Sequence, residues 1–333
     1  MNLIFVQLIF LFGVVLSACD KYQVELLGEE RNELNEGPHW DEKNRMLYFV
    51  DIHSSSLLRY NPENKKFYRG KLNGTKSVGF AIPVNGTNNQ FVVGADLDLL
   101  LVQWDGSSPD IKTVRTLVKI DDRKAGTRFN DAKVDFMGRL VAGTMLDGPG
   151  EPNDEILLSL GSDLTKQILL EHVGLSNGIA WNRELGKMYH CDSTKHTVTQ
   201  YDYDEKTGVI RNPVVLINIS VKKYKLPESA VPDGMTIDTE GILYIAVHGG
   251  GRVLQFDPIK KEIIHEIMIP APQVTSVAFG GKDMNILFVT TAAEATNGKP
   301  VKDKNAGRLY TVKGLKAKGH KANMFVLDHK YLN

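Results

Sequence analysis

Three oxygen-bearing side chains, Glu36, Asn177 and Asp233, stand at the same place in separate copies of a recurring sequence unit. Each is followed by a glycine, then within a few positions by an apolar residue, and then by a short turn and a second apolar segment. Two carboxylates and one amide carbonyl, with water completing the shell, suit a hard divalent cation such as Ca²⁺, Mg²⁺ or Mn²⁺. The set contains neither thiolate nor imidazole, which disfavours a closed structural zinc site.

The same residues also have a simpler interpretation. Asn-Gly and Asp-Gly are ordinary turn dipeptides, so Asn177-Gly178 and Asp233-Gly234 could be turns that start strands. A turn requirement does not explain why Glu36 occupies the equivalent position. We therefore expect metal ligands, with turn residues as the alternative.

Arg128 and Asn130 form a second pair of interest. Residues i and i+2 of an extended segment project to the same side. If Asn130, which leads another copy of the unit, faces the point where the three oxygen donors meet, Arg128 does so too. A guanidinium there could hold a substrate oxygen through paired hydrogen bonds. The alternative is a solvent-exposed surface arginine.

The elements that must position these residues are short strands joined by turns, and a first strand is expected at 22–27. Copies of the unit begin near Glu36, Ser77, Asn130, Asn177, Asp233 and Thr275. They step by roughly 40–55 residues, as four-stranded blades do, and helical periodicity is nearly absent. Equivalent positions of propeller blades surround one axis. The sequence therefore predicts an all-β, six-bladed β-propeller with a central metal site, in which Glu36, Asn130, Asn177 and Asp233 surround the channel.

Other reactive constellations are less convincing. The segment 174–178 matches the Gly-x-Ser-x-Gly elbow of serine hydrolases, but that motif requires a strand-to-helix turn, and a strand-like segment follows. Cys191 lies inside a strand pattern and is interpreted as a small core residue. The histidines show no His-Glu-x-x-His spacing. His248, just before three glycines, is interpreted as a loop residue, with a place at the channel mouth as the alternative.

Composition limits the partners. The chain of 333 residues has 40 Lys and Arg against 40 Asp and Glu, and a formal net charge of zero. Nucleic-acid binding would need a basic face, so we predict no nucleic-acid partner. The lysine-rich end is interpreted as a solvated tail; its lysines are Lys313, Lys316, Lys318 and Lys321. The oligomeric state stays open.

The N-terminus is typical of an exported protein. Residues 3–16 are almost wholly apolar, and Ser17-Ala18-Cys19 follows with small side chains. A membrane-spanning helix needs about 20 apolar residues, so we expect no membrane span. We predict a signal peptide over 1–18, a single propeller domain over 19–333 and secretion, although no basic residue precedes Leu3. A bacterial lipoprotein cleavage box is the alternative.

Several segments together resemble the regucalcin, gluconolactonase and luciferin-regenerating enzyme family. The resemblance runs from about Asn35 to Gly314. It is carried by Asn35-Glu36-Gly37-Pro38-His39-Trp40, Arg128-Phe129-Asn130-Asp131-Ala132-Lys133-Val134-Asp135, Ala142-Gly143-Thr144-Met145, Ser176-Asn177-Gly178-Ile179-Ala180-Trp181, Pro232-Asp233-Gly234-Met235 and Val277-Ala278-Phe279-Gly280-Gly281.

The resemblance implies a six-bladed propeller with one divalent metal in its channel, whether Ca²⁺, Zn²⁺, Mg²⁺ or Mn²⁺. Its ligands would be Glu36, Asn177 and Asp233, and Asp233 would also be the catalytic acid/base. Arg128 and Asn130 would hold the substrate. The implied activity is hydrolysis of a small-molecule sugar lactone. Regucalcins are also described as calcium-binding proteins.

The chain departs from the family pattern in ways that keep alternatives open. Ala132 replaces a common glycine, and Asp147 only approximately matches a carboxylate that helps to bind the sugar. The apolar leader is unusual for cytosolic regucalcins. One alternative is a secreted calcium- or ligand-binding propeller without turnover. Another is a hydrolase of a non-sugar ring, as in the luciferin-regenerating branch.

Overall fold

The computed structural model describes residues 22–120, 123–148, 150, 153–220, 222–295 and 301–332. The signal peptide expected over 1–18, and Cys19 beside it, lie outside the described residues. Helix in the described part of the chain is limited to two short 3-10 segments, η1 (Lys222–Tyr224) and η2 (His329–Tyr331). No helix among the described residues is long and apolar enough to cross a membrane.

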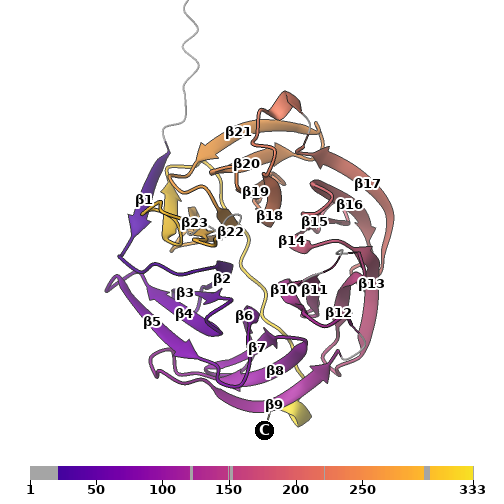
Figure 1. The fold of residues 1–333 in the computed structure, drawn as a ribbon. Coiled ribbons are helices and arrows are strands. Elements are labelled where there is room, and N and C mark those ends of the chain that lie inside the picture. The colour runs from indigo at the N-terminus through magenta and orange to yellow at the C-terminus, as the bar shows by residue number, and fades with distance from the viewer. Residues whose placement is uncertain are drawn as a thin grey trace, which may run out of the picture.

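Six four-stranded antiparallel sheets surround a central axis, which confirms the predicted six-bladed β-propeller (Figure 1). We number the sheets as blades in chain order, from the innermost strand outward. Blade 1 contains β2 (Asn35–Asp41), β3 (Met46–Asp51), β4 (Ser56–Asn61) and β5 (Lys66–Lys71), and blade 2 contains β6 (Val78–Pro83), β7 (Gln90–Ala95), β8 (Asp98–Gln103) and β9 (Lys112–Lys119). Blade 3 contains β10 (Thr127–Val134), β11 (Leu140–Leu146), β12 (Glu155–Leu160) and β13 (Lys166–Val173), and blade 4 contains β14 (Ser176–Asn182), β15 (Lys187–Asp192), β16 (Thr197–Tyr203) and β17 (Ile210–Asn218). Blade 5 contains β18 (Val231–Ile237), β19 (Leu243–His248), β20 (Arg252–Asp257) and β21 (Glu262–Met268), and blade 6 contains β22 (Val274–Gly280), β23 (Ile286–Thr291), β24 (Leu309–Lys313) and β1 (Gln23–Leu27).

Blade 6 takes strands from both ends of the chain. The expected N-terminal strand is β1, and it pairs antiparallel with β24 from Gln23 opposite Lys313 to Leu27 opposite Leu309. The innermost strands contact one another in ring order, β2, β6, β10, β14, β18 and β22, and β22 contacts β2. The pairing of β1 with β24 thus closes the ring by backbone hydrogen bonds between the two ends of the chain. It also covers the edge of β24 that would otherwise be open.

The core lies between the blades, where the alternating apolar side chains of the inner strands meet. Trp40 of blade 1, for example, stacks on Phe288 of blade 6 at 5.4 Å between ring centroids. Phe80 of blade 2 packs edge-on against Phe129 of blade 3. Each blade therefore buries its face only against its neighbours, as the repeat pattern requires.

The C-terminal segment corrects the interpretation of a solvated tail. We call residues 318–328 the C-terminal strap; Figure 1 shows this segment in yellow crossing the centre of the ring. Its backbone bonds to blades 5 and 6 through Lys318 and Gly319, and to blade 2 through Phe325. Phe325 is completely buried in the core shared by blades 2 and 3. The lysine side chains of the strap stay exposed, so the charges are solvated while the backbone is docked.

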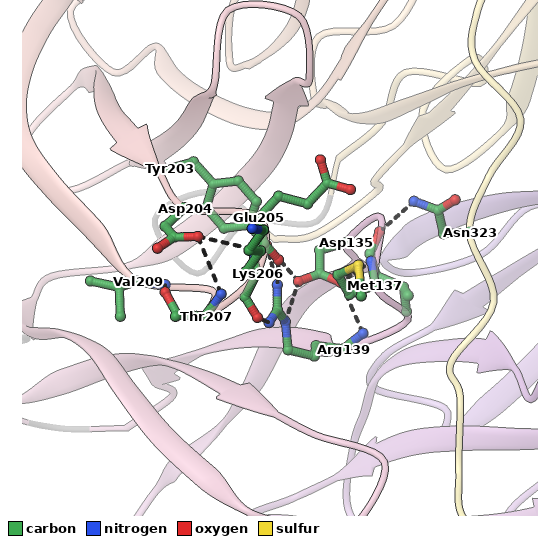
Figure 2. A network of polar contacts seen from close by, with 11 residues as sticks. Asp135, Met137, Arg139, Tyr203, Asp204, Glu205, Lys206, Thr207, Val209 and Asn323 are labelled. Atoms are coloured by element: carbon green, nitrogen blue, oxygen red, sulfur yellow. Dashed lines mark hydrogen bonds and ion pairs between the residues drawn. The ribbon is translucent and has the colours of Figure 1, made fainter.

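A polar network ties blade 3 to blade 4 beside the strap (Figure 2). The Asp135 carboxylate accepts hydrogen bonds from Arg139 Nε at 2.6 Å and from the Tyr203 hydroxyl at 2.5 Å. Arg139 also donates to the main-chain carbonyl of Glu205, and Asn323 of the strap donates to the carbonyl of Val134. The buried carboxylate of Asp135 therefore has hydrogen-bond partners for both of its oxygens, and these bonds fix the turn between β10 and β11.

We expect Phe325→Ala to lower the free energy of unfolding by about 3–5 kcal/mol, because it removes a completely buried ring and leaves a cavity in the core shared by blades 2 and 3. Val326→Ala is the matched control. Val326 is the next residue of the strap and its side chain is exposed, so this substitution should lower the free energy of unfolding by well under half as much. Urea denaturation followed by tryptophan fluorescence measures both variants. Equal stabilities for the two variants would mean that the strap does not contribute to the core.

Candidate active site

A β-bulge interrupts every innermost strand near its start. The pairing with the second strand of the blade shifts between Glu36 and His39 in β2, and the corresponding shifts occur in β6, β10, β14, β18 and β22. Glu36 is the last paired residue before its bulge, and Asn130, Asn177 and Asp233 are the first unpaired residues of theirs. A bulge bends the strand and re-aims a side chain. Asn130, Asn177 and Asp233 are thereby released from the regular alternation at the inner edge of their blades, and Glu36 stands directly before the corresponding shift.

The glycines after Asn177 and Asp233 lie inside strands, so the turn interpretation is wrong. A Cβ on Gly178 would lie 2.6 Å from the carbonyl oxygen of Asp233, and one on Gly234 would lie 2.7 Å from Cα of Ser276. Neither glycine has a positive φ. They are required because the next blade approaches their backbone closely, and this approach brings the leading residues of adjacent blades together.

Glu36 and Asp233 are both buried, with 5% and 6% of their surface exposed. Burial, reinforced by the nearby Asp131 carboxylate, raises the pKa of Glu36 to about 8. Burial and the charge of Glu36 raise the pKa of Asp233 well above its usual range. Within the described chain, Asp233 Oδ1 is buried without a hydrogen-bond partner. The buried carboxylates at the axis thus include an oxygen that no described protein group pairs.

Asn177 is held from two sides. Its Nδ2 donates to Ser193 Oγ at 2.8 Å, and that hydroxyl donates to the carbonyl of Pro232. Its Oδ1 accepts from Asn130 Nδ2 at 2.8 Å, which leaves the second lone pair of this oxygen available. The amide oxygen is therefore oriented by neighbours on both sides.

The oxygen-donor set fits a hard divalent cation. A cation would offset the excess negative charge that burial penalises at Glu36 and Asp233, and Asn177 Oδ1 is a suitable neutral ligand. No group of three or more His, Cys, Asp and Glu side chains in the described ranges gathers closely enough to hold a metal. The candidate set consists of two carboxylates and the amide of Asn177, so it contains only two side chains of those four types.

Arg128 is buried, which overturns the surface-arginine alternative. Its Nε donates to Asp147 Oδ2 at 2.7 Å, and its Nη1 donates to Asn130 Oδ1 at 2.9 Å. Asn130 in turn donates to Asn177, so a continuous line of hydrogen bonds runs from Asp147 to Asn177. The Asp147 side chain is 40% exposed. The substrate-binding candidates Arg128, Asn130 and Asp147 therefore lie together beside Asn177.

Three titratable residues lie together near the same end of the channel, and the sequence reasoning missed two of them, His53 and Glu294. His53 Nε2 lies 3.1 Å from Glu294 Oε1, and His248 Nε2 lies 3.7 Å from Glu294 Oε2. His248 is the last residue of β19, which corrects its interpretation as a loop residue. A signal existed: a polar residue stands at or just after the end of each second strand, as at His53, Asp147 and Glu294.

The excluded nucleophiles stay excluded. Ser176 Oγ lies 2.8 Å from His190 Nε2, but Ser176 is a completely buried residue of β14 and not the tip of an elbow. Cys191 is completely buried in the core, as predicted, and burial raises the pKa of its thiol. Neither side chain can reach a substrate from these places.

A separate cavity of about 120 Å³ lies between the innermost strands and the strap. Its lining includes His39, Asp131 and Lys133 together with residues 320–323 of the strap. Glu36, Asn177 and Asp233 do not line it. Ala132, which replaces a glycine of the expected pattern, is buried and lines this cavity, so its methyl group is accommodated on the side away from the candidate ligands.

Comparison with known proteins gives consistent matches. A profile described as the SMP-30/gluconolactonase/LRE-like region matches residues 34–293. Regucalcin of Danio rerio is 34% identical over 300 residues, covering 89% of this chain and 96% of the relative. The "Putative sugar lactone lactonase YvrE" of Bacillus subtilis is 36% identical over 289 residues, covering 86% and 93%.

Solved structures agree with these sequence matches. A luciferin-regenerating enzyme superposes with a TM-score of 0.86 at 35% identity, covering 92% of this chain and all of that chain. A calcium-binding protein, regucalcin, from Agrobacterium tumefaciens superposes with a TM-score of 0.79 at 20% identity, covering 92% and 98%. At that identity the second likeness concerns the fold alone.

We expect Glu294→Gln to lower the pKa of His53, which the interaction with Glu294 raises above its usual value. Burial opposes ionisation of Glu294, but its contacts with His248 and His53 lower the pKa of Glu294 to about 2. The stabilisation from this pair is fully present below the usual His pKa of about 6.5 and is lost as the pH rises through the raised pKa of His53. At the acidic end it is lost as the pH falls through the lowered pKa of Glu294.

Proton NMR titration of the imidazole signals measures the change, with His53→Gln assigning the resonance. Glu266→Gln is the control, because Glu266 lies on the outermost strand of blade 5, β21, and its carboxylate pairs with Arg252 of β20. A His53 pKa that is the same in Glu294→Gln and in the unsubstituted protein would contradict the assignment.

Proposed function

The chain belongs to the SMP-30/gluconolactonase/LRE-like family, and we propose that it is a divalent-metal-dependent hydrolase that opens sugar lactones. The observation that carries this proposal is the pair of buried carboxylates, Glu36 and Asp233, beside the hydrogen-bonded line Asp147–Arg128–Asn130. The name of the Bacillus subtilis relative, at 36% identity, also supports lactone hydrolysis. Fold likeness alone would not support an activity.

Glu36, Asn177 and Asp233 would hold the metal ion. The ion would supply Lewis-acid polarisation of the lactone carbonyl or lower the pKa of a bound water. Oxygen ligands favour Ca²⁺, Mg²⁺ or Mn²⁺, and Zn²⁺ remains to be compared with them. The unpartnered Asp233 Oδ1 and the second lone pair of Asn177 Oδ1 support this set.

The protein side chains would bind the ring and move the proton. Arg128, fixed by Asp147, would donate hydrogen bonds that orient the lactone and steady the developing oxyanion. Asn130 Nδ2 already donates to the main-chain carbonyl of Ser176 and to Asn177 Oδ1, so Asn130 would bind the substrate through the second lone pair of its Oδ1. Asp233 would accept a proton from the attacking water and return it to the ring oxygen as the acyl carbon–oxygen bond breaks. Such a proton transfer contributes about 10²–10⁴-fold.

Two other functions remain candidates. A binding propeller without turnover is supported by the name regucalcin, which relatives at 32–34% identity carry. A hydrolase of a non-sugar ring is supported by the likeness to a luciferin-regenerating enzyme at 35% identity. We favour the sugar lactone hydrolase because the departure at Asp147 keeps a carboxylate within 2.7 Å of Arg128. We further propose that the chain is secreted, because residues 3–16 are almost wholly apolar and fit a signal peptide over 1–18.

We expect Asp233→Ala to lower hydrolysis of δ-gluconolactone by at least about 10²-fold, since it removes both a ligand and the proton acceptor. The assay uses protein stripped of metal and then given Ca²⁺, Mg²⁺, Mn²⁺ or Zn²⁺ one at a time. Asp257→Asn is the control: this carboxylate lies in the same blade, at the end of β20 away from the axis, and its loss should change the rate less than about threefold. Full activity of Asp233→Ala on every lactone tried would refute the proposed mechanism.

Metal binding can be measured without turnover. A metal at 100 times its dissociation constant stabilises the folded state by about 2.7 kcal/mol. Adding the activating metal should therefore raise the melting temperature of the stripped protein by several degrees, and Glu36→Gln should abolish the increase. Binding without hydrolysis across a wide lactone panel would favour the non-catalytic candidate. A melting temperature that no divalent metal changes would exclude the metal site.

A further inference from the structure

The group His53, Glu294 and His248 connects three blades near the mouth of the channel. His53 follows β3 of blade 1, His248 ends β19 of blade 5, and Glu294 follows β23 of blade 6, which lies between them in the ring. One carboxylate oxygen of Glu294 contacts each histidine, at 3.1 and 3.7 Å. The three side chains remain 26–31% exposed. We call them the Glu294 group.

The backbone under Glu294 is fixed. Gln273 Nε2 donates to the carbonyl of Glu294 at 3.2 Å, and the amide of Ala293 donates to the carbonyl of Glu33 at 2.8 Å. The carboxylate is thus attached to a segment bonded both to the start of blade 6 and to the segment before blade 1. A charged group on such a support loses little freedom when it binds a ligand.

The Glu294 group lies across the axis from Arg128 and Asp147. In the ring order of innermost strands, β22 of blade 6 is three steps from β10 of blade 3, which is the opposite place in a ring of six (Figure 1). The charge of Glu294 acts on both Glu36 and Asp233, and the charges of Arg128 and Asp147 act on His53. Both groups therefore lie within electrostatic range of the same small space above the leading residues.

The two walls are chemically complementary to hydroxyl groups. Asp147 and Glu294 present acceptor oxygens, and Arg128 and the histidines present donors. A carboxylate can accept about four hydrogen bonds, and the two histidines use only part of that capacity. A ring bearing several hydroxyls can satisfy both walls, whereas an unsubstituted or aromatic ring would cover these polar groups without pairing them, which a site rejects strongly.

We propose that Glu294, positioned by His53 and His248, is a specificity-determining residue that binds ring hydroxyls of a polyhydroxylated lactone opposite Arg128 and Asp147. This inference rests on the proposed lactone hydrolysis and selects sugar lactones over non-sugar rings. Glu294 binds the part of the ring that does not react, so its removal should weaken recognition and leave the chemical step itself largely intact.

Kinetics on two lactones of the same ring size test the proposal. For Glu294→Ala we expect kcat/KM on δ-gluconolactone to fall about 10- to 100-fold, mainly through KM, because a hydrogen bond to a charged group is lost. Activity on δ-valerolactone, which lacks the hydroxyls, should change less than about twofold. Glu294→Gln, which keeps an acceptor oxygen without the charge, should be intermediate. Glu266→Gln, the outer-strand control, should match the unsubstituted protein.

A purely structural role predicts a different result. If Glu294 only joins three blades, its removal will lower the melting temperature and reduce both lactones by the same factor, through kcat as much as KM. That outcome would overturn the proposal. A preference of the unsubstituted protein for δ-valerolactone over δ-gluconolactone would also overturn it, while leaving lactone hydrolysis as the function.

Binding of non-hydrolysable lactams separates this inference from the proposed activity. By isothermal titration calorimetry, the unsubstituted protein should bind glucono-δ-lactam more tightly than δ-valerolactam. Glu294→Ala should reduce the ratio of the two dissociation constants at least tenfold. This result would support the Glu294 group even if no lactone were hydrolysed. Equal binding of the two lactams, or no binding of either, would refute the hydroxyl-recognition role whatever the hydrolysis assay shows.

Discussion

The bulge near the start of each innermost strand is the constraint on which the site depends. A regular strand would alternate its side chains between the two neighbouring blades and leave little aimed along the inner edge. The shift in pairing frees Asn130, Asn177 and Asp233 from that alternation. Glycine follows two of them because the backbone of the next blade passes within contact distance there. The motif is therefore a packing requirement between blades and a source of oxygen donors at once.

Once gathered, these side chains create an electrostatic problem that the fold solves only in part. Glu36 and Asp233 are buried near each other, and burial is the main reason that the pKa of each is raised. The neutral amides of Asn130 and Asn177 bond to each other and supply no charge. The guanidinium of Arg128 is already paired with Asp147. A protein designed for stability alone would place apolar residues here, so the two buried carboxylates support the proposed metal site.

Local repetition made the blades and the leading residues predictable from the sequence, because each copy forms its own hairpins within about fifty residues. Nonlocal features were not predictable in this way. The pairing of β1 with β24 joins positions almost 290 residues apart, and nothing in Gln23–Leu27 names its partner. The lysines of the strap predict a solvated tail, whereas the buried side chains of Phe325 and Leu327 and several backbone hydrogen bonds anchor it. Glu294 was missed because its role depends on His53 and His248, which come from two other blades.

The two sets of residues differ in how freely a sequence can change them. The leading residues sit in bulges where neighbouring blades touch, so a replacement there disturbs packing as well as chemistry. His53, Asp147 and Glu294 stand beyond the ends of second strands, where their side chains are 28–40% exposed and not packed between blades. Asp147 illustrates the consequence: it only approximately matches the expected carboxylate, yet it still reaches Arg128 at 2.7 Å. Substrate choice can therefore shift at the mouth while the bulge residues below it stay fixed, which is why the mouth, and not the leading residues, should distinguish a sugar lactone from another ring.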